Sequence, residues 1–293
     1  MDSGLTPYQK TMQIVQKYDF IFRKRFGQNF LVDAHVLDKI VAAADVGPED
    51  VVLEIGPGIG TLTVALAARA GHVVAVEIDR SLLPILAETL EGYSNVTVIG
   101  QDIMETDIDE IAKTYGGGRP IKVVANLPYY IATPIVMGLL EKDAPISQIV
   151  VMVQKEVASR MQAVPGTKDY GALSLAVLYH AQAYLAANVP PNCFIPRPRV
   201  SSAVLRLTPR GKPSVDVGDP AFMFALIRAA FATRRKTLAN SLGHDPALEA
   251  LGITKESAAE AIAGLGFPPA VRGEALGLEE FARLSDALGG SRG

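Results

Sequence analysis

The sequence predicts an α/β fold in which helices cover both faces of a mostly parallel, Rossmann-like sheet, followed by a small all-helical region. Between residues 51 and 161, short apolar runs alternate with helix-like segments four or five times. Strands of a parallel sheet are buried on both faces, so they are short and almost wholly apolar. Beyond residue 209 the chain becomes rich in alanine with helical periodicity and no clear strand. These patterns predict one domain over residues 1–209 and a helical second domain over residues 210–293.

The individual elements follow from local signals along the chain. A short amphipathic helix is predicted at residues 7–18, residues 23–31 are expected to form a loop, and Asp33 is a candidate N-cap for a helix to about residue 44. Strands are predicted at residues 51–55, 73–76, 96–99, 121–125, 149–153, 183–189 and 203–208. Helices are predicted at residues 61–70, 81–90 and 134–141, and after the fifth strand up to residue 161.

The second domain is expected to begin after a linker at residues 210–218, which is rich in glycine and proline. Asp219 then precedes Pro220, which is an N-cap followed by the residue best suited to the first helical position. One helix is predicted from there to Leu242, with Gly243 as its stop.

Composition excludes several classes of protein. The single cysteine, Cys193, rules out a disulfide framework within the chain, and the four scattered histidines have no metal-ligand spacing. No apolar run is long enough to cross a bilayer, and the polar N-terminus lacks the apolar core of a signal peptide. We therefore expect a cytoplasmic protein without a metal ion and without a membrane partner. A monomer is a separate expectation that composition does not decide.

The charge of the chain neither requires nor excludes a nucleic-acid partner. The formal net charge of −3 counts weakly against one. A local basic surface is enough for RNA binding, however, and basic clusters occur at residues 23–25 and 234–236. Taken alone, such a cluster is more typical of a solvated face.

The first chemical signal is a glycine-rich turn between a predicted strand and a predicted helix, Glu54-Ile55-Gly56-Pro57-Gly58-Ile59-Gly60. Glycines allow positive φ and let the backbone approach a ligand closely, although the same residues also form ordinary tight turns. Dinucleotide-binding folds use G-x-G-x-x-G to seat a pyrophosphate on a helix N-terminus. The G-x-G-x-G spacing here argues against NAD. It favours S-adenosylmethionine, whose cationic amino-acid end attracts carboxylates such as Glu54.

Two more carboxylates follow the next two predicted strands. Glu77 ends the second strand, where a carboxylate can accept hydrogen bonds from ribose hydroxyls. Asp102 follows the third strand and can accept a hydrogen bond from an adenine amino group, while Ile103 can pack on the ring. The carboxyl ends of parallel strands meet at one edge of the sheet, so these residues together with Gly56 and Gly58 predict a site for a nucleoside-containing cofactor.

The fourth strand ends in Asn126-Leu127-Pro128-Tyr129, a sequence that ordinary turns also use. The exocyclic amine of a nucleobase is a poor nucleophile because its lone pair is delocalised into the ring. The side-chain oxygen of Asn126 and the carbonyl of Pro128 can accept hydrogen bonds from this amine, and Tyr129 offers a stacking face. Such oxygens also stabilise the positive charge that develops on the nitrogen during methyl transfer.

This segment and the glycine turn together resemble the rRNA adenine dimethyltransferases. Residues 26–31 (FGQNFL) look like the cofactor-contacting loop of this family, residues 192–200 (NCFIPRPRV) like its late F-x-P-x-P-x-V segment, and residues 231–238 (FATRRKTL) like its C-terminal basic helix. The chain is most similar to the small-subunit branch, which dimethylates two adjacent adenosines near the 3′ end of bacterial 16S rRNA.

The resemblance assigns roles to particular residues. It implies contacts with S-adenosylmethionine from Asn29, Leu31, Gly56, Glu77, Asp102 and Asn126. It implies that Asn126, Pro128 and Tyr129 surround the reacting base and that Phe194 supplies a second stacking face, for which core packing is the alternative interpretation. It also implies 16S rRNA or the immature small ribosomal subunit as the partner.

RNA binding is expected from the C-terminal basic residues. Arg228 and Arg235 are seven residues apart, so on one continuous helix they would share a face and grip phosphates as a pair. Arg234 and Lys236 would extend the patch.

Three alternatives remain open at this point. The first is a resistance-type methyltransferase acting on 23S rRNA, which shares the fold and the Asn-Pro-Tyr chemistry. The second is a ribosome-assembly factor with a vestigial cofactor site, and the third is a DNA adenine methyltransferase.

Overall fold

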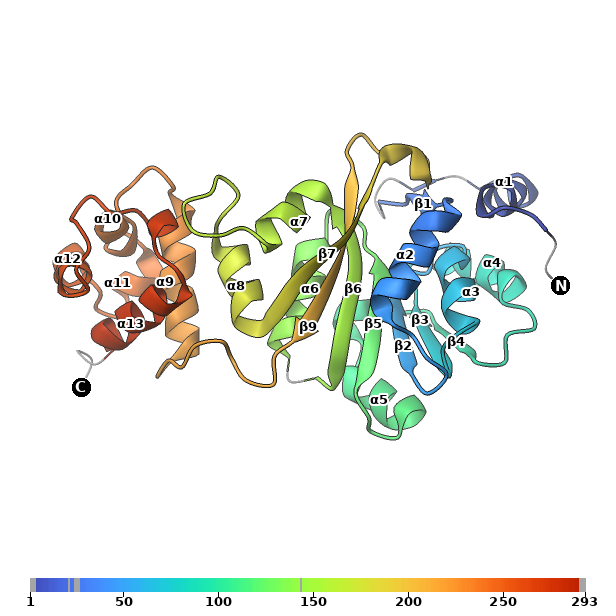
Figure 1. Ribbon diagram of the computed structural model, residues 1–293, viewed down its shortest axis with the longest axis horizontal. Helices are drawn as coiled ribbons and strands as arrows, with labels where there is room; N and C mark the ends of the chain where they lie inside the picture. Colours follow the sequence, from blue (N-terminus) through green and yellow to red (C-terminus); the bar gives the residue numbers. More distant parts are fainter. Residues whose placement is uncertain (1–3, 21, 24–26, 143, 290–293) are drawn as a thin grey trace. The chain divides into compact units, whose positions relative to one another are not determined.

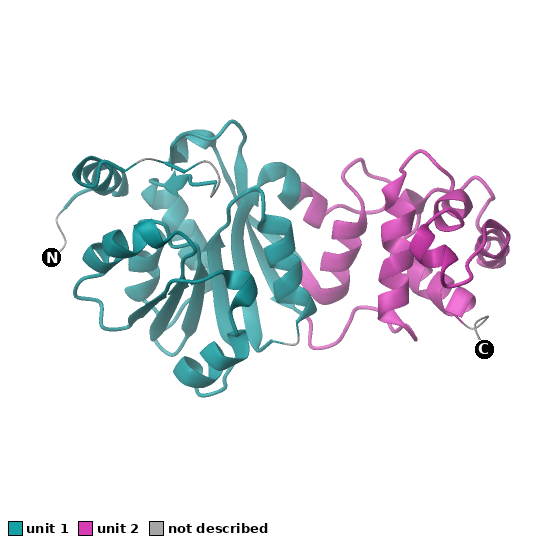
Figure 2. Cartoon of the chain, turned by 180° about the vertical axis from the view of Figure 1, so that it is seen from behind, with its two compact units in different colours: residues 1–158, 183–209 teal, residues 159–182, 210–293 magenta. Residues whose placement is uncertain are grey.

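The computed structural model describes residues 4–20, 22–23, 27–142 and 144–289. The chain forms two compact units (Figure 2). Unit 1 comprises residues 1–158 and 183–209, and unit 2 comprises residues 159–182 and 210–293. Residue 209 is thus one of the points where the chain passes between the units, and residues 159–182 join the C-terminal helices.

Unit 1 is built on a seven-stranded sheet with the strand order β4-β3-β2-β5-β6-β9-β7 (Figure 1). The first five strands of this order are parallel, and β9 pairs antiparallel with β6. The strands are β2 (Val51–Ile55), β3 (His72–Val76), β4 (Val96–Ile99), β5 (Ile121–Asn126), β6 (Ile146–Gln154), β7 (Ala181–Val189) and β9 (Ser202–Pro209). The predicted α/β architecture and all seven predicted strands are confirmed.

Helices cover the sheet because their apolar faces match its apolar strands. The helices of unit 1 that follow or precede its strands are α2 (Ala34–Ala44), α3 (Thr61–Ala67), α4 (Leu83–Thr89), α5 (Ile108–Gly116) and α6 (Ala132–Glu141), and α7 (Lys155–Met161) begins in unit 1 and ends in unit 2. Ile40 of α2 and Leu66 of α3 are buried in one cluster with Val52, Val124 and Val150 of the central strands. Sequence reasoning missed α5, although Asp107 caps it by accepting a hydrogen bond from the Glu110 amide (3.0 Å).

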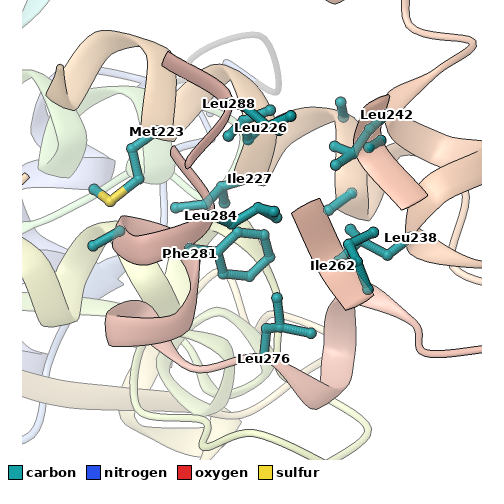
Figure 3. Packing of buried hydrophobic residues seen from close by; sticks show 14 of the residues in the cluster. Met223, Leu226, Ile227, Leu238, Leu242, Ile262, Leu276, Phe281, Leu284 and Leu288 are labelled. Atoms are coloured by element: carbon teal, nitrogen blue, oxygen red, sulfur yellow. The ribbon is translucent and has the colours of Figure 1, made fainter. Parts of the chain in front are cut away.

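Unit 2 has a separate hydrophobic core (Figure 3). Its helices are α8 (Ala172–His180), α9 (Pro220–Ala232), α10 (Leu238–Leu242), α11 (Pro246–Glu249), α12 (Lys255–Gly264) and α13 (Leu278–Gly289). Phe281 of α13 is fully buried beside Leu226 and Ile227 of α9. Leu175 and Tyr179 of α8 belong to the same core, which explains why residues 159–182 are part of this unit.

The prediction of one helix from Pro220 to Leu242 is wrong. Helix α9 ends at Ala232, and Thr233 leaves the helix with φ −135° and ψ 82°. A second helix, α10, starts only at Leu238, whose amide donates to the Val271 carbonyl (2.7 Å) and whose side chain is fully buried. The break turns the chain so that α10 packs back on α9, which a straight helix could not do.

The described residues contain neither a membrane-spanning helix nor a cluster of metal-binding side chains. No helix among them is long and apolar enough to span a membrane. No group of three or more histidine, cysteine, aspartate or glutamate side chains in the same ranges is placed to hold a metal ion.

Candidate active site

The strand order of unit 1 brings the predicted site residues into one row. Strands β4, β3, β2 and β5 are parallel neighbours, so Asp102, Glu77, Gly56 and Asn126 follow one another along a single edge of the sheet. Neighbouring strands lie about 4.8 Å apart, so the four strand ends span about 14 Å. Starting from β2, the chain adds β3 and β4 on one side of the sheet and then β5 and β6 on the other side. Open α/β sheets bind ligands at the point where the strand order reverses in this way, which here lies between β2 and β5.

A cavity lies along this row. The described residues that line it include nearly every residue that the sequence assigned to the cofactor or the reacting base: Asn29, Leu31, Glu54, Gly56, Gly58, Glu77, Asp102, Ile103, Asn126, Pro128 and Tyr129. Phe26 of the N-terminal motif lies outside the described residues.

The glycine turn directly follows β2 and lines the cavity. Gly56, Gly58 and Gly60 have φ values of 68°, 62° and 90°, which side chains rarely adopt. A Cβ on Gly58 would come within 3.1 Å of the Phe30 ring, whereas the position of a Cβ on Gly56 faces open space. The turn therefore presents bare backbone to the cavity, as a tightly fitting ligand requires.

Glu77 is held rigidly at the end of β3. Its Oε1 accepts a hydrogen bond from the Asp79 amide (2.8 Å) and its Oε2 accepts one from the Gly58 amide (3.1 Å). Burial raises the pKa of the Glu77 carboxyl, and these backbone donors oppose the increase. Each oxygen retains a lone pair, so the carboxylate can still accept hydrogen bonds from the two hydroxyls of a ribose.

Glu54 is a buried carboxyl in the middle of the sheet. Only 1% of its surface is exposed, and its Oε2 has no hydrogen-bond partner among the described residues. Burial raises the pKa of Glu54 to about 8, an increase that the neighbouring Thr63 hydroxyl opposes and the Glu77 carboxyl reinforces. Without a ligand this carboxyl is therefore largely protonated at neutral pH, and a cationic ligand group placed beside it would favour the ionised form.

Asp102 caps a short 3₁₀ turn that begins at Ile103. Its Oδ1 accepts a hydrogen bond from the Met104 amide (2.9 Å), which leaves Oδ2 without this constraint. Both Asp102 and Ile103 are half-buried and line the cavity.

Asn126 is oriented by the N-terminal part of the chain. Its Nδ2 donates to the Asn29 carbonyl (3.1 Å), and the Nδ2 of Asn29 donates in turn to the Gly27 carbonyl (2.9 Å). With the amide nitrogen turned toward the Asn29 carbonyl, the Oδ1 of Asn126 points away from that carbonyl and can accept a hydrogen bond from a ligand. Residues 27–29 were expected to lie in a cofactor-contacting loop that includes Asn29, and the structure adds that the Asn29 carbonyl also holds the side chain of Asn126.

The residues after Asn126 continue the wall of the cavity. The Pro128 carbonyl accepts a hydrogen bond from the Ile131 amide (3.2 Å) and has a second lone pair available. The hydroxyl of the half-buried Tyr129 forms a hydrogen bond with the hydroxyl of Ser202, and the two oxygens are 2.8 Å apart. Ser202 lies on β9 and is fully buried. Burial raises the pKa of Tyr129, so its hydroxyl is neutral at physiological pH. The Ser202 hydroxyl therefore anchors the hydroxyl end of the Tyr129 side chain.

Phe194 lies in the core and is absent from the described residues that line the cavity. It belongs to β8 (Phe194–Ile195), which pairs antiparallel with β1 (Phe30–Leu31), and only 3% of its surface is exposed. Its ring packs in the cluster that contains Leu31 and Cys193. In this structure the core-packing interpretation describes Phe194 better than a stacking face does.

The basic residues of unit 2 do not form the expected pair on one helix. Arg228 lies on α9, but Arg235 lies in the turn between α9 and α10, so the seven-residue spacing argument is wrong. Arg234 is engaged within unit 2, with its Nη2 3.5 Å from the Glu274 carboxylate and 3.4 Å from the Tyr170 carbonyl. Three basic residues of unit 2 are exposed and form no ion pair with another described residue: Arg228, Arg235 and Lys236.

Three site features were not found from the sequence. Ser202 contacts Tyr129 from a strand that is 73 residues away, a distance that no local motif reveals. Tyr130 lines the cavity and is 60% exposed, which only the fold shows. Asp79 connects the glycine turn to the N-terminal part of the chain, and its position two residues after Glu77 was the available signal.

Comparison with known proteins agrees with this geometry. The model of the family described as ribosomal RNA adenine dimethylase matches residues 19–263. Ribosomal RNA small subunit methyltransferase A of Lachnoclostridium phytofermentans is 57% identical over 281 residues, which cover 96% of each chain.

Two solved structures share the fold. A dimethyladenosine transferase from Plasmodium falciparum has a TM-score of 0.71 at 27% identity, covering 87% of this chain and 95% of its own. The 23S rRNA methyltransferase ErmE has a TM-score of 0.65 at 27% identity, covering 89% and 100%. The extent of the family match and the identity to the bacterial relative lead to one conclusion: the chain belongs to the ribosomal RNA adenine dimethylase family.

Proposed function

We propose that this enzyme transfers methyl groups from S-adenosylmethionine to the exocyclic amino nitrogen of two adjacent adenosines near the 3′ end of 16S rRNA, giving dimethyladenosines during small-subunit biogenesis. The observation that carries the proposal is the orientation of Asn126. Its amide nitrogen is bound to the Asn29 carbonyl, so its oxygen is free beside the glycine turn.

The residues of the cavity fit S-adenosylmethionine in size and charge. The open space beside Gly56 gives room, the Glu77 carboxylate suits the ribose, and Asp102 with Ile103 suits the adenine. The unpaired carboxyl of Glu54 suits the cationic amino-acid end. When bound, S-adenosylmethionine supplies an electrophilic methyl group. Asn29, Leu31 and Asn126, which also line the cavity, are the remaining residues that we assign to cofactor contacts.

The protein's own groups prepare the amine for methylation. The Oδ1 of Asn126 and the carbonyl of Pro128 accept hydrogen bonds from the two amine hydrogens, which draws the nitrogen toward tetrahedral geometry and frees its lone pair. Both oxygens are preorganised, so they stabilise the positive charge that develops on the nitrogen without a reorganisation cost. The methylated nitrogen is strongly acidic and loses its proton to water, so a strong general base is not needed. Tyr129, held by Ser202, stacks on the base.

The RNA substrate must present an unstacked adenine, because a base inside a helix cannot reach the cavity. We assign backbone contacts to Arg228, Arg235 and Lys236, which are exposed cations of unit 2. Arg234 is a weaker candidate because Glu274 already partners its guanidinium. A second stacking contact from Phe194 stays a prediction that requires its ring to leave the core.

A resistance-type activity on 23S rRNA is the main competing function. The likeness to ErmE supports the shared fold and chemistry, yet its identity is 27%, against 57% for the small-subunit enzyme of Lachnoclostridium phytofermentans. This difference favours the small-subunit substrate. We further propose that the enzyme acts as a monomer in the cytoplasm and needs no metal ion.

The experiment that tests the proposal identifies the methylated product. The purified protein is incubated with methyl-labelled S-adenosylmethionine and either unmethylated small-subunit particles or large-subunit rRNA, and digested nucleosides are analysed by mass spectrometry. We expect dimethyladenosine from the small-subunit substrate alone, in the presence of a chelator. Label in large-subunit rRNA would support the resistance-type function. Cofactor binding without transfer to either substrate would support a role in assembly with vestigial catalysis.

A further inference from the structure

Asp79 is a buried carboxylate beside the cofactor site that the chemistry described so far does not use. Only 2% of its surface is exposed, and it is absent from the described residues that line the cavity. Four donors surround it. Its Oδ1 accepts from the Ser81 amide (3.1 Å), the Ser81 hydroxyl (2.7 Å) and the Nη1 of Arg23 (3.1 Å), and its Oδ2 accepts from the Nε2 of Gln28 (2.8 Å).

Asp79 is joined to the ribose-binding carboxylate through its own backbone. The Asp79 amide donates to the Oε1 of Glu77, while the Oε2 of Glu77 accepts from the Gly58 amide. Asp79, Glu77 and the glycine turn are thus joined by consecutive hydrogen bonds.

On its other side Asp79 fastens the N-terminal segment, defined as residues 22–23 and 27–31. Gln28 donates to Asp79 and accepts from the Arg23 amide through its Oε1 (2.7 Å), so one side chain joins the two parts of the segment and attaches them to Asp79. The next residue of this segment is Asn29, whose carbonyl orients Asn126. Phe30 follows and lies against Gly58.

A local role does not account for this arrangement. Asp79 also caps the short 3₁₀ turn at Arg80–Leu82, but that role uses only the Ser81 amide. The bonds from Gln28 and Arg23 come from more than 50 residues away and satisfy the charge of a carboxylate that burial would otherwise leave unpaired.

We propose that Asp79 is a positioning residue that holds residues 27–31 in place as a wall of the cofactor site, so that cofactor affinity depends on the Asp79–Gln28 bond although Asp79 does not line the cavity. This inference rests on the proposed cofactor. It implies that the wall formed by residues 27–31 and the Glu77 carboxylate are set together by one buried charge.

The test is a charge-swap cycle at Asp79 and Gln28. Asparagine caps helices as well as aspartate does, so Asp79→Asn preserves the turn but removes the charge and places an amide donor near Gln28 and Arg23. Gln28→Glu places two carboxylates against each other. In the double variant the introduced asparagine amide can donate to the introduced glutamate carboxylate, and Arg23 regains an anionic partner.

Binding of S-adenosylmethionine is measured by calorimetry without RNA. We expect each single variant to bind about tenfold or more weakly, as loss of a hydrogen bond to a charged group predicts, and the double variant to return to within about threefold of the wild type. Amide hydrogen exchange at residues 27–31 of the free protein should accelerate in the single variants and recover in the double. Asp107→Asn, at the exposed N-cap of α5, is the matched control and should bind normally.

Wild-type affinity in Asp79→Asn, or a double variant no better than the worse single variant, would overturn the inference. If Asp79→Asn does not fold, Gln28→Ala breaks the same hydrogen bond; because Gln28 itself lines the cavity, hydrogen exchange at residues 29–31 is measured beside cofactor affinity, and normal affinity or unchanged exchange in that variant would contradict the inference. Failure of the wild-type protein to bind S-adenosylmethionine would instead count against the proposed function, so the two failures are distinguishable.

Discussion

Glu54 makes the stability of unit 1 depend on pH in a direction that can be measured. In the unfolded chain this carboxyl ionises near its ordinary value of 4.5, whereas burial raises the pKa of Glu54 to about 8 in the folded protein. Between these values the folded state binds more protons than the unfolded state, so the free energy of unfolding falls as pH rises. The contribution is fully present below pH 4.5 and is lost as pH rises through about 8.

The size of the effect follows from the pKa. Each pH unit inside this window changes the free energy by about 1.4 kcal/mol, so the change between about pH 5.5 and 7.5 is about 2.7 kcal/mol. Over the whole window the change is about 5 kcal/mol. This is a large share of the stability of a typical domain.

The perturbation that isolates this effect is Glu54→Gln, which keeps the shape of the side chain and cannot ionise. Urea unfolding is followed by circular dichroism at about pH 5.5, 6.5 and 7.5, and the variant is compared with the wild type at each pH so that other titrating groups cancel. The variant should gain stability relative to the wild type by about 1.4 kcal/mol per pH unit. Glu91→Gln, at an exposed position, is the control and should give a difference that does not change with pH. A pH-independent difference for Glu54→Gln would refute the reasoning.

Three further predictions concern substrate contacts. Ser202→Ala removes the partner of the Tyr129 hydroxyl and should lower kcat by about two- to tenfold, as loss of about 0.5–1.5 kcal/mol implies. The affinity for S-adenosylmethionine should not change. If Ser202→Ala lowers kcat by the same factor in a Tyr129→Phe background, the bond between the two hydroxyls does not contribute to the rate. Tyr130→Ala should raise the KM for RNA, because a ring that is 60% exposed at the cavity rim can stack on a nucleotide for about 1–3 kcal/mol; Tyr8→Ala, at another exposed tyrosine, should not change it. Arg235→Ala should weaken RNA binding and reduce the salt dependence of log K by about 0.7–0.9, as measured by titration at several salt concentrations, and an unchanged slope would exclude a phosphate contact.

Local patterns predicted the part of the site that the sheet itself positions. The glycine turn, Glu77 and Asp102 each follow an apolar strand, and a parallel sheet necessarily places such residues at one edge. Asn126 could be found for the same reason. These residues needed no knowledge of distant contacts.

Long-range contacts account for what the sequence did not reveal. Ser202 reaches Tyr129, and Gln28 reaches Asp79, across separations that carry no periodic signal. The break between α9 and α10 is set by the burial of Leu238 in the core of unit 2, which overrides a sequence compatible with one long helix. The same break removed the basis for pairing Arg228 with Arg235.

The most direct test of the account compares wild type and Asn126→Ala in the labelled methylation assay on unmethylated small-subunit particles. Removing one preorganised oxygen should lower the rate of dimethyladenosine formation by about 10²–10³. The variant loses its own cofactor contact and its bond to the Asn29 carbonyl, but it should retain its fold and still bind S-adenosylmethionine through the Glu77 and glycine-turn contacts, so rates are compared at saturating cofactor. A variant that binds cofactor and forms dimethyladenosine at the wild-type rate would contradict the central claim that the Asn126 oxygen activates the amine.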